Sequence, residues 1–474
     1  MTIATLRFTL ADQRAFARLS GDFNPVHVDP VAARRVAAGE PIVHGMHLLL
    51  RALDARFKRG QAPGRCSVSA RFQRPALLGE SIQVQATAHD HLTLTLEGAD
   101  PLVEVALGNK EAAADAAWSG SIRRGRGRAT RTPRIRAFAD ISSAQGAIEF
   151  SDTPAIRRAF PHLARRLGGA TVAAMAALSR LVGMECPGRD SLLSAVDLDV
   201  TPNAAASRLT WRVSKADERF GLIRLEVSSA CIRGTVDAFL RPPPASTPAF
   251  ASVAAQLATG EFVGQRALIV GGSRGLGAAT ALIVSSGGGA SLVTFTSGTA
   301  EVAALQRDAR RSGRRIEALR FDILNDPIAR LAHASSRLGA THLYFFATPR
   351  IFARRREPFD AALFRRFAAF YVTGFADVCA AARGSSPLDV FYPSSTALDQ
   401  HIRELTEYSA AKAAGEMLCG MLQTTTPSLR ILVRRLARVA TDQTASLIPA
   451  RALDPVTAML PIVREMQRAG GAHS

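Results

Sequence analysis

The spacing of apolar residues changes along the chain and separates two kinds of region. In the first kind, apolar and polar residues alternate, as at Leu92, Leu94 and Leu96, which is the period of a half-buried strand. In the second kind, from Arg266 onward, short apolar runs such as RALIV and LDVFY alternate with helical stretches. The first pattern predicts an antiparallel sheet, and the second predicts a parallel sheet with helices on both faces.

The antiparallel part of the chain contains two similar segments. The sequence PGR occurs at Pro63 and again at Pro187, and an apolar helical segment precedes each copy, at 44–57 and 171–182. Strand-like segments follow both copies. A chance match of three residues is the alternative, but the shared order of elements favours a duplicated unit in which a sheet wraps around a helix.

Two segments of unusual composition predict the boundaries between folded parts. Seven arginines crowd residues 121–136, which have few large apolar residues and are typical of a flexible connector. Prolines crowd residues 241–248 and favour an extended linker. We therefore predict three folded parts, at 1–120, 138–240 and 260–474.

The composition narrows the classes of function. The formal net charge is +19, only four of the 59 Lys and Arg residues are lysines, and the arginine-rich segment lacks interleaved aromatic residues that would stack on bases. We therefore expect an anionic small molecule or an acidic partner rather than nucleic acid. Five scattered cysteines without a CxxC pair, no long apolar run and no secretory signal predict a cytoplasmic protein with reduced thiols and no membrane span. We expect no metal site.

One short segment concentrates residues suited to acid–base chemistry. Asp22 and Asn24-Pro25 lie among turn formers, so Asp22 and His27 should share one ordered loop. A carboxylate beside an imidazole can transfer protons. Gly45 opens the following apolar helix, and the amides at a helix N-terminus can polarise a thioester carbonyl. The alternative is that Asp22 caps a helix and His27 is an ordinary surface histidine.

The segment SGDFNPVH and the later HGM resemble the MaoC-like (R)-specific enoyl-CoA hydratase family. The resemblance implies a hotdog fold and the reversible hydration of a trans-2-enoyl thioester. It also implies that Asp22 and His27 hold the catalytic water, that Asn24 supports their loop and that the Gly45 amide receives the thioester oxygen. Residues 138–240 resemble the degenerate half of double-hotdog hydratases, which supports the substrate tunnel rather than the chemistry.

The last part of the chain contains a second constellation. A glycine-rich turn at the end of RALIV stands where a dinucleotide pyrophosphate binds backbone amides. Tyr408 and Lys412 are one helical turn apart, and a nearby ammonium would lower the pKa of the phenol toward neutrality. Ser394-Ser395 ends the strand LDVFY, which places the Ser395 hydroxyl at the carboxyl edge of the sheet, where ligands bind. Each motif alone also occurs by chance. The turn consists of Gly271, Gly272, Ser273, Arg274, Gly275, Leu276 and Gly277.

Together these residues resemble the short-chain dehydrogenase/reductase family, with Ser395 thirteen residues before Tyr408. The resemblance implies that Tyr408 protonates the substrate carbonyl and that Ser395 orients the substrate. It implies that Lys412 lowers the pKa of Tyr408 and holds the cofactor ribose. Further cofactor contacts are implied for the glycine-rich turn and for Asp322, Ala347 and Thr441.

The same segment departs from that family in ways that bear on its chemistry. Tyr371 stands where the family has an Asn that relays protons through water. The usual last strand is missing, so we expect a sheet of six strands. No acidic residue follows the second strand of this part, whereas Arg274 can reach a 2′-phosphate. We therefore expect NADPH as the cofactor.

The two implied chemistries are consecutive steps. We predict an α+β double hotdog followed by an α/β Rossmann-type parallel sheet, in a homodimeric, bifunctional 3-oxoacyl-thioester reductase and 3-hydroxyacyl-thioester dehydratase. It would act on acyl-carrier-protein or coenzyme A thioesters in fatty-acid or polyketide biosynthesis. One alternative is a catabolic acyl-CoA hydratase and 3-hydroxyacyl-CoA dehydrogenase. The other is a hydratase fused to a catalytically inactive nucleotide-binding scaffold.

Overall fold

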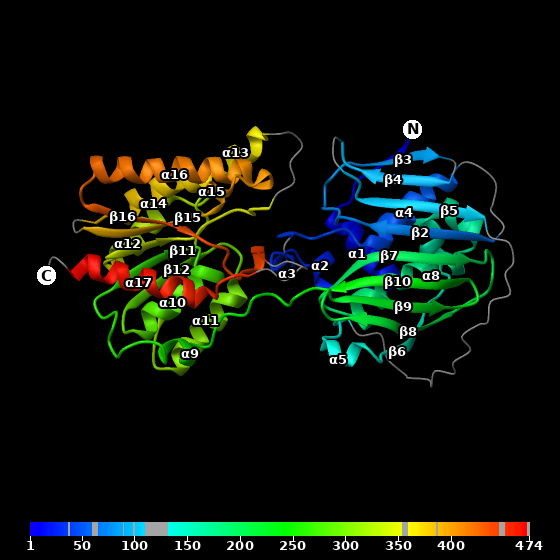
Figure 1. The fold of residues 1–474 in the computed structure, drawn as a ribbon, viewed down its shortest axis with the longest axis horizontal. Helices are drawn as coiled ribbons and strands as arrows, with labels where there is room; N and C mark the ends of the chain where they lie inside the picture. Colours follow the sequence, from blue (N-terminus) through cyan, green and yellow to red (C-terminus); the bar gives the residue numbers. More distant parts are fainter. Residues whose placement is uncertain are drawn as a thin grey trace. The chain divides into compact units, whose positions relative to one another are not determined.

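The computed structural model describes residues 1–474 apart from 37, 59–64, 89, 98–99, 110–130, 353–358, 385–386, 445–450 and 472–474. The chain forms two compact units, which we call the N-terminal unit (Met1–Pro243) and the C-terminal unit (the described residues from Pro244 onward) (Figure 1). Residues 241–249 contain no helix or strand, as expected for a run of prolines without amide donors.

One antiparallel sheet of ten strands forms the framework of the N-terminal unit, with the order β1-β3-β4-β5-β2-β7-β10-β9-β8-β6. The alternating burial along its strands matches the apolar period of the sequence, as in β9, where every second residue is buried. The strands are β1 (Thr2–Leu6), β2 (Cys66–Phe72), β3 (Ile82–Ala88), β4 (His91–Thr95), β5 (Val103–Asn109), β6 (Gln145–Glu149), β7 (Ser191–Val200), β8 (Arg208–Asp217), β9 (Leu222–Ser228) and β10 (Ile232–Leu240).

The order of strands repeats within this sheet. Each copy has five strands. Its first strand lies at the edge of the sheet, its third, fourth and fifth strands follow toward the centre, and its second strand lies innermost. The two copies join where β2 pairs with β7, from Cys66↔Val200 to Arg71↔Ala195. This shared topology supports the duplicated unit that the two PGR segments indicate, although Pro63 lies outside the described residues.

Helices α4 (Gly45–Phe57) and α8 (Gly169–Arg180) occupy equivalent places after the first strand of each copy, and both pack into the core that the sheet wraps. Nearly every residue of α8 is buried. A π-helical turn, η1 (Leu181–Glu185), extends α8. The remaining helices of this unit are α1 (Leu10–Ser20), α2 (Pro25–Val28), α3 (Pro30–Ala33), α5 (Phe138–Ile141), α6 (Pro154–Ala159) and α7 (Pro161–Leu167).

Among the described residues, no single helix is long and apolar enough to cross a bilayer. The helices Pro161–Leu167 and Gly169–Glu185, which meet at a bend of 116°, reach that length and apolar composition only when taken together.

The arginine-rich segment is only partly described. Residues 121–130 fall outside the described residues. The prediction that 121–136 is a flexible connector is wrong for the end of this segment. Arg134 Nε lies 2.9 Å from Glu185 Oε2, and Arg136 Nε donates to the Glu185 carbonyl at 2.8 Å. These contacts attach the end of the segment to the second copy.

Six parallel strands in the order β13-β12-β11-β14-β15-β16 form the sheet of the C-terminal unit. In chain order this is 3-2-1-4-5-6, the arrangement of a doubly wound dinucleotide-binding fold, so the predicted fold class and the six strands are confirmed. The strands are β11 (Arg266–Val270), β12 (Ala290–Phe295), β13 (Ile316–Arg320), β14 (His342–Phe345), β15 (Leu388–Ser395) and β16 (Leu429–Leu436).

Helices cover both faces of this sheet (Figure 1). On one face, the sheet forms a hydrophobic core with α9 (Phe250–Ala254), α10 (Gly275–Ser286), α11 (Thr299–Arg311) and α17 (Pro455–Gly471). The other core contains residues of α12 (Ile328–Leu338), α13 (Ala361–Ala368), the π-helical η2 (Ala369–Gly374), α14 (Phe375–Ala382), α15 (Ala397–Gln400), the short turn η3 (Arg403–Leu405) and α16 (Thr406–Thr425). A 3-10 turn, η4 (Asp442–Thr444), follows β16.

Candidate active sites

The loop that carries Asp22 is fixed at both ends by local sequence. Helix α1 ends at Gly21, which has a left-handed conformation (φ 80°) that glycine adopts without strain. Asn24 then caps α2 by accepting the Val26 amide, and Pro25 occupies the first helical position. The Asn24 amide donates to Asp22 Oδ1 at 3.0 Å. The sequence therefore presents Asp22 in an ordered turn, with its carboxylate buried.

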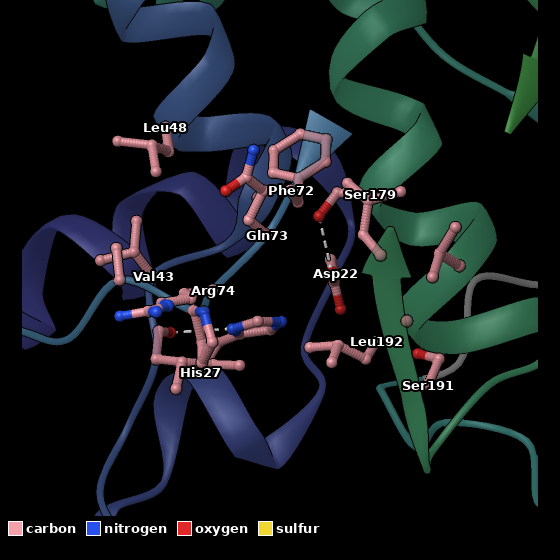
Figure 2. Close-up of a pocket in the computed structure, with 17 residues that line it drawn as sticks. Asp22, His27, Val43, Leu48, Phe72, Gln73, Arg74, Ser179, Ser191 and Leu192 are labelled. Atoms are coloured by element: carbon pink, nitrogen blue, oxygen red, sulfur yellow. Dashed lines mark hydrogen bonds between the residues drawn. The ribbon is translucent and has the colours of Figure 1, made fainter. Parts of the chain in front are cut away.

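The second copy completes the surroundings of this carboxylate. Ser179, near the end of α8, donates its hydroxyl to Asp22 Oδ2 at 2.7 Å, and Figure 2 shows Asp22 between elements of the two copies. A Cβ placed on Gly183 would lie 2.4 Å from Asp22 Oδ1, so the carboxylate occupies space that only a glycine leaves open. Asn24 Nδ2 also donates to the carbonyls of Gly183 and Arg189, each at 3.0 Å. Ser179 and Gly183 therefore belong to the site, contrary to the expectation that the second copy only shapes a tunnel.

His27 lies on α2 beside this carboxylate. Its Nδ1–H donates to the Ile42 carbonyl at 2.8 Å, so in the neutral ring Nε2 carries the lone pair. Figure 2 shows this second ring nitrogen on the side of Asp22, and both residues line one pocket. His27 is thus not an ordinary surface histidine but one member of a carboxylate–imidazole pair.

Burial moves the pKa values of the pair toward each other. It raises the pKa of Asp22, while the charge of His27 and the hydrogen bonds from Ser179 and the Asn24 amide oppose the rise. It lowers the pKa of His27, opposed by the charge of Asp22. Two groups whose affinities for a proton converge can exchange it with a bound water, as general acid–base catalysis requires.

His44 contacts both members of the Asp22–His27 pair. Its ring stacks on that of His27 with 3.9 Å between centroids, and its ring nitrogens lie 2.8 Å from Gln13 Oε1 and 3.1 Å from the Asp22 carbonyl oxygen. Ligand atoms of Asp22, His27 and His44 all lie within 4.8 Å of one another, a spacing that suits a metal ion. Because both His44 nitrogens already contact oxygens, the cluster serves better as a hydrogen-bond network.

Gly45 opens α4 in the wall of the same pocket. A Cβ at this position would lie 2.9 Å from Leu193 Cδ2 and 3.2 Å from Phe72 Cε1, so glycine allows both side chains to pack over the helix end. The first amides of a helix carry partial positive charge. The pocket thus combines the Asp22–His27 pair with a helix N-terminus, and its wall contains the apolar residues Ile42, Val43, Leu48, Phe72, Val182, Leu192 and Leu193.

The glycine-rich turn of the C-terminal unit lies where the sequence predicts, between β11 and α10. Gly271 has φ +84°, and a Cβ there would lie 2.8 Å from the Ala347 amide nitrogen. A Cβ on Gly277 would lie 2.4 Å from the Gly271 carbonyl oxygen. The turn is therefore tight enough to expose the amides at the start of α10, which fits a pyrophosphate. It also lies beside Thr441, whose Cγ2 would be 3.4 Å from a Cβ on Gly275.

Other predicted cofactor residues have partners within the protein. Ser273 packs beside Gly298 at the start of α11, and Leu276 packs against the core. Arg274 Nη1 lies 3.0 Å from Asp442 Oδ2, so its guanidinium is held by a carboxylate rather than directed outward. Asp322 accepts the Leu324 amide and the Asn325 side chain within its own turn.

Ser395 and Tyr408 come together, but Lys412 does not join them. A hydrogen bond between the Ser395 and Tyr408 hydroxyls lowers the pKa of Tyr408, yet burial raises it more. Lys412 Nζ donates instead to the Pro393 carbonyl at 2.6 Å. The expectation that Lys412 lowers the pKa of Tyr408 is therefore wrong in this structure, because burial dominates and the ammonium is engaged elsewhere.

Comparisons with known proteins match the part of the chain that contains the first of these sites. Residues 2–97 match the family model described as MaoC like domain. Over 88 residues the chain is 42% identical to the (R)-specific enoyl-CoA hydratase of Aeromonas caviae. This match covers 17% of this chain and 64% of that protein. Over 113 residues it is 32% identical to 3-hydroxyacyl-thioester dehydratase X of Mycobacterium tuberculosis, covering 20% of this chain and 39% of that protein. The chain thus spans less than two thirds of these relatives.

Solved structures of short-chain dehydrogenases resemble part of the chain. A short-chain dehydrogenase from Burkholderia cenocepacia in complex with NADP is 18% identical, with a TM-score of 0.39, and the match covers 44% of this chain and 91% of that one. A putative short-chain dehydrogenase from Escherichia coli complexed with NADPH is 15% identical, with a TM-score of 0.39, covering 44% and 93%. The strand order of the C-terminal unit carries the fold assignment on its own.

Proposed function

We propose that the chain is a bifunctional enzyme on acyl thioesters. Its N-terminal unit would interconvert a trans-2-enoyl thioester and an (R)-3-hydroxyacyl thioester, and its C-terminal unit would reduce a 3-oxoacyl thioester with NADPH. The observation that carries the proposal is the Asp22–His27 pair in one pocket with the first residue of α4. The relatives named above are hydratases and dehydratases of such substrates.

Hydration adds water across the C2–C3 double bond. In the proposed mechanism Asp22 and His27 hold the water and take one of its protons as its oxygen forms a bond to C3, and the pair delivers a proton to C2. Negative charge develops on the thioester oxygen, and the amide of Gly45 is placed to stabilise it. Dehydration is the reverse, in which the pair removes the proton from C2 and returns it to the leaving hydroxide.

In the C-terminal unit, the chain's own residues would handle the substrate and its proton. The glycine-rich turn and the start of α10 would bind the dinucleotide pyrophosphate, and bound NADPH would supply a hydride to the substrate carbonyl carbon. Ser395 would orient the carbonyl, and Tyr408 would donate its proton to the oxygen. The raised pKa of Tyr408 keeps that proton in place at neutral pH.

Direction and substrate carrier are further parts of the proposal. NADPH favours reduction, so we place the two reactions in sequence, reduction and then dehydration, in fatty-acid or polyketide biosynthesis by a homodimer in the cytoplasm. A net charge of +19 suits either coenzyme A or an acidic carrier protein. A scaffold without reductase activity is the second candidate, and the sequestered Lys412 favours it.

One coupled assay tests the whole proposal. Full-length protein is given NADPH with acetoacetyl-CoA or its carrier-protein equivalent, while NADPH loss and enoyl formation are followed together. We expect both. Tyr408→Phe should stop NADPH loss but leave hydration of crotonyl-CoA unchanged, and Asp22→Asn should make the 3-hydroxyacyl thioester accumulate. If wild-type protein binds NADPH but oxidises none with any 3-oxoacyl thioester, the C-terminal unit is a scaffold.

A further inference from the structure

The ammonium of Lys412 lies in a cage of aromatic rings. Its Nζ is 3.9 Å from the centroid of the Tyr371 ring and 4.7 Å from that of Tyr392, and it donates to the Pro393 carbonyl at 2.6 Å. The lysine is buried. A cation over a tyrosine face is attracted by the ring's electron density, and the attraction grows when water is excluded. We call Tyr371 and Tyr392 the tyrosine cage.

The tyrosine cage is held in place by contacts that do not involve the lysine. The Tyr371 hydroxyl lies 2.5 Å from that of Thr348, and the Tyr392 hydroxyl donates to the Tyr371 carbonyl at 3.2 Å. A Cβ on Gly415 would lie 1.9 Å from the Tyr392 hydroxyl, so α16 makes room for this ring with a glycine. The rings of Tyr371 on η2 and Tyr392 on β15 thus form a preformed binding site for the lysine head group.

Two titratable side chains favour the positive charge of Lys412. Glu416 and Cys419, both on α16, favour its charged form, but burial outweighs them and lowers the pKa of Lys412 to about 7. Glu416 is already bound by Arg435 of β16 at 2.6 and 2.9 Å. The ring of Tyr408 meets that of Tyr371 edge-on. The two ring faces and the Pro393 carbonyl are therefore direct contacts of the lysine head group.

We propose that Tyr371 and Tyr392 are positioning residues, whose ring faces hold Lys412 on the Pro393 carbonyl and thereby order the end of β15 that carries Ser395. Ser395 is two residues beyond Pro393 and is the hydrogen-bond partner of Tyr408. The lysine would act on the acid Tyr408 through the strand rather than through its charge. This proposal rests on the proposed reductase function of Ser395 and Tyr408.

The scarcity of lysines makes the cage directly measurable. The chain has four, Lys58, Lys110, Lys215 and Lys412, so full-length protein labelled with ¹³C at lysine Cε gives four NMR signals, and Lys412→Met identifies the one of interest. We expect this signal to titrate at least about two pH units below the ordinary lysine value of ~10.4. Burial lowers this midpoint, whereas attraction by the ring faces raises it, so the wild-type midpoint serves as the reference for the ring variants.

Ring variants distinguish the cage from general burial. Tyr371→Phe keeps the ring face and loses only the hydroxyl contact with Thr348, so it should change the Lys412 midpoint less than Tyr371→Leu does. Tyr371→Leu removes the face, which favours the charged lysine, and should lower the midpoint by at least about half a pH unit, roughly the lower limit of a cation–π contact. The matched control is Tyr344→Leu, which removes a fully buried tyrosine ring on β14 of the same unit, whose hydroxyl donates to Gln265 Oε1. An effect of Tyr344→Leu equal to that of Tyr371→Leu contradicts the proposal.

Kinetics separate this proposal from the proposed function. With NADPH and acetoacetyl-CoA, Tyr371→Leu should lower kcat at least tenfold with a smaller change in the KM for NADPH, and Tyr371→Phe should lower kcat less. Equal kcat in all three proteins would remove the positioning role. A wild-type protein without NADPH oxidation would refute the reductase, whereas the lysine titration would still decide whether the cage exists. If Tyr371→Leu does not fold, Tyr392→Leu, which removes the other ring face, takes its place, and an unchanged Lys412 midpoint in it contradicts the proposal.

Discussion

The two candidate sites both rest on a pair of titratable residues at short spacing, but only one pair meets. Asp22 and His27 lie within 4.8 Å of each other in the N-terminal unit. In the C-terminal unit Tyr408 and Lys412 share one face of α16, yet the lysine head group turns to Pro393 and the tyrosine cage. Spacing on a helix or loop fixes where side chains begin. Where a long side chain ends depends on residues elsewhere, here on η2 and β15.

Removing either member of the Asp22–His27 pair tests the stronger half of this comparison. We expect Asp22→Asn and His27→Ala each to lower crotonyl-CoA hydration at least about a hundredfold, the scale of a lost general acid or base. NADPH oxidation with acetoacetyl-CoA should persist in both, which shows that the protein remains folded. Near-normal hydration in both variants would refute the assignment of this site.

The contribution of the second copy predicts the next largest effect. Ser179→Ala removes a hydrogen bond to a carboxylate, worth about 1.5–3 kcal/mol, so hydration should fall about tenfold or more. The bond favours the charged form of Asp22, and its loss should raise the pKa of Asp22 further. The acid limb of the kcat/KM profile for hydration therefore moves to higher pH.

Thr171→Val is the matched control for that change. Thr171 is buried on the same helix, but its hydroxyl donates to the Leu167 carbonyl of the preceding helix and not to Asp22. Hydration and its pH profile should remain those of the wild type. An unchanged acid limb in Ser179→Ala would show that the second copy plays no part in the proton chemistry.

The sequence predicted the elements well and placed Asp22 and His27 on one ordered loop, where they line one pocket, for reasons visible in particular residues. Gly21, Asn24 and Pro25 form their turn through local rules, so the position of Asp22 could be read without a structure. The roles of Ser179 and Gly183 could not, because they reach Asp22 only through the pairing of the two copies. The same holds for Lys412, whose partners Tyr371 and Tyr392 lie on other elements.

The preference for NADPH depends on Arg274, whose side chain also contacts a residue far away in the sequence, Asp442. If Arg274 binds the 2′-phosphate, it must leave Asp442, which also accepts the Ala245 amide at 3.0 Å. We expect Arg274→Ala to weaken NADPH binding about tenfold, the loss of a contact worth ~1–3 kcal/mol, without changing NADH binding. Asp442→Asn keeps an acceptor for Ala245 but frees the guanidinium, so it should tighten NADPH binding a few-fold. Titration by cofactor fluorescence checks both, and a wild-type preference for NADH would refute this role of Arg274.

The smallest expected effect is one of stability, and it isolates the charge of Lys412. Burial lowers the pKa of Lys412 to about 7 in the folded protein, against ~10.4 in the unfolded chain. Between these values the unfolded chain binds more protons, so the lysine makes the folded state more stable as pH rises from about 7 to about 10 and less stable below. Lys412→Met removes the buried charge and should raise the unfolding temperature of the C-terminal unit by a few degrees at pH 6, since ~1 kcal/mol corresponds to about 2–4 °C in a unit of this size. The gain should shrink at pH 9. Thermal unfolding at both pH values, with hydrogen exchange of α16 peptides to identify the transition, gives the comparison. A gain that is equal at both pH values would mean that the methionine improves packing rather than relieving a buried ammonium.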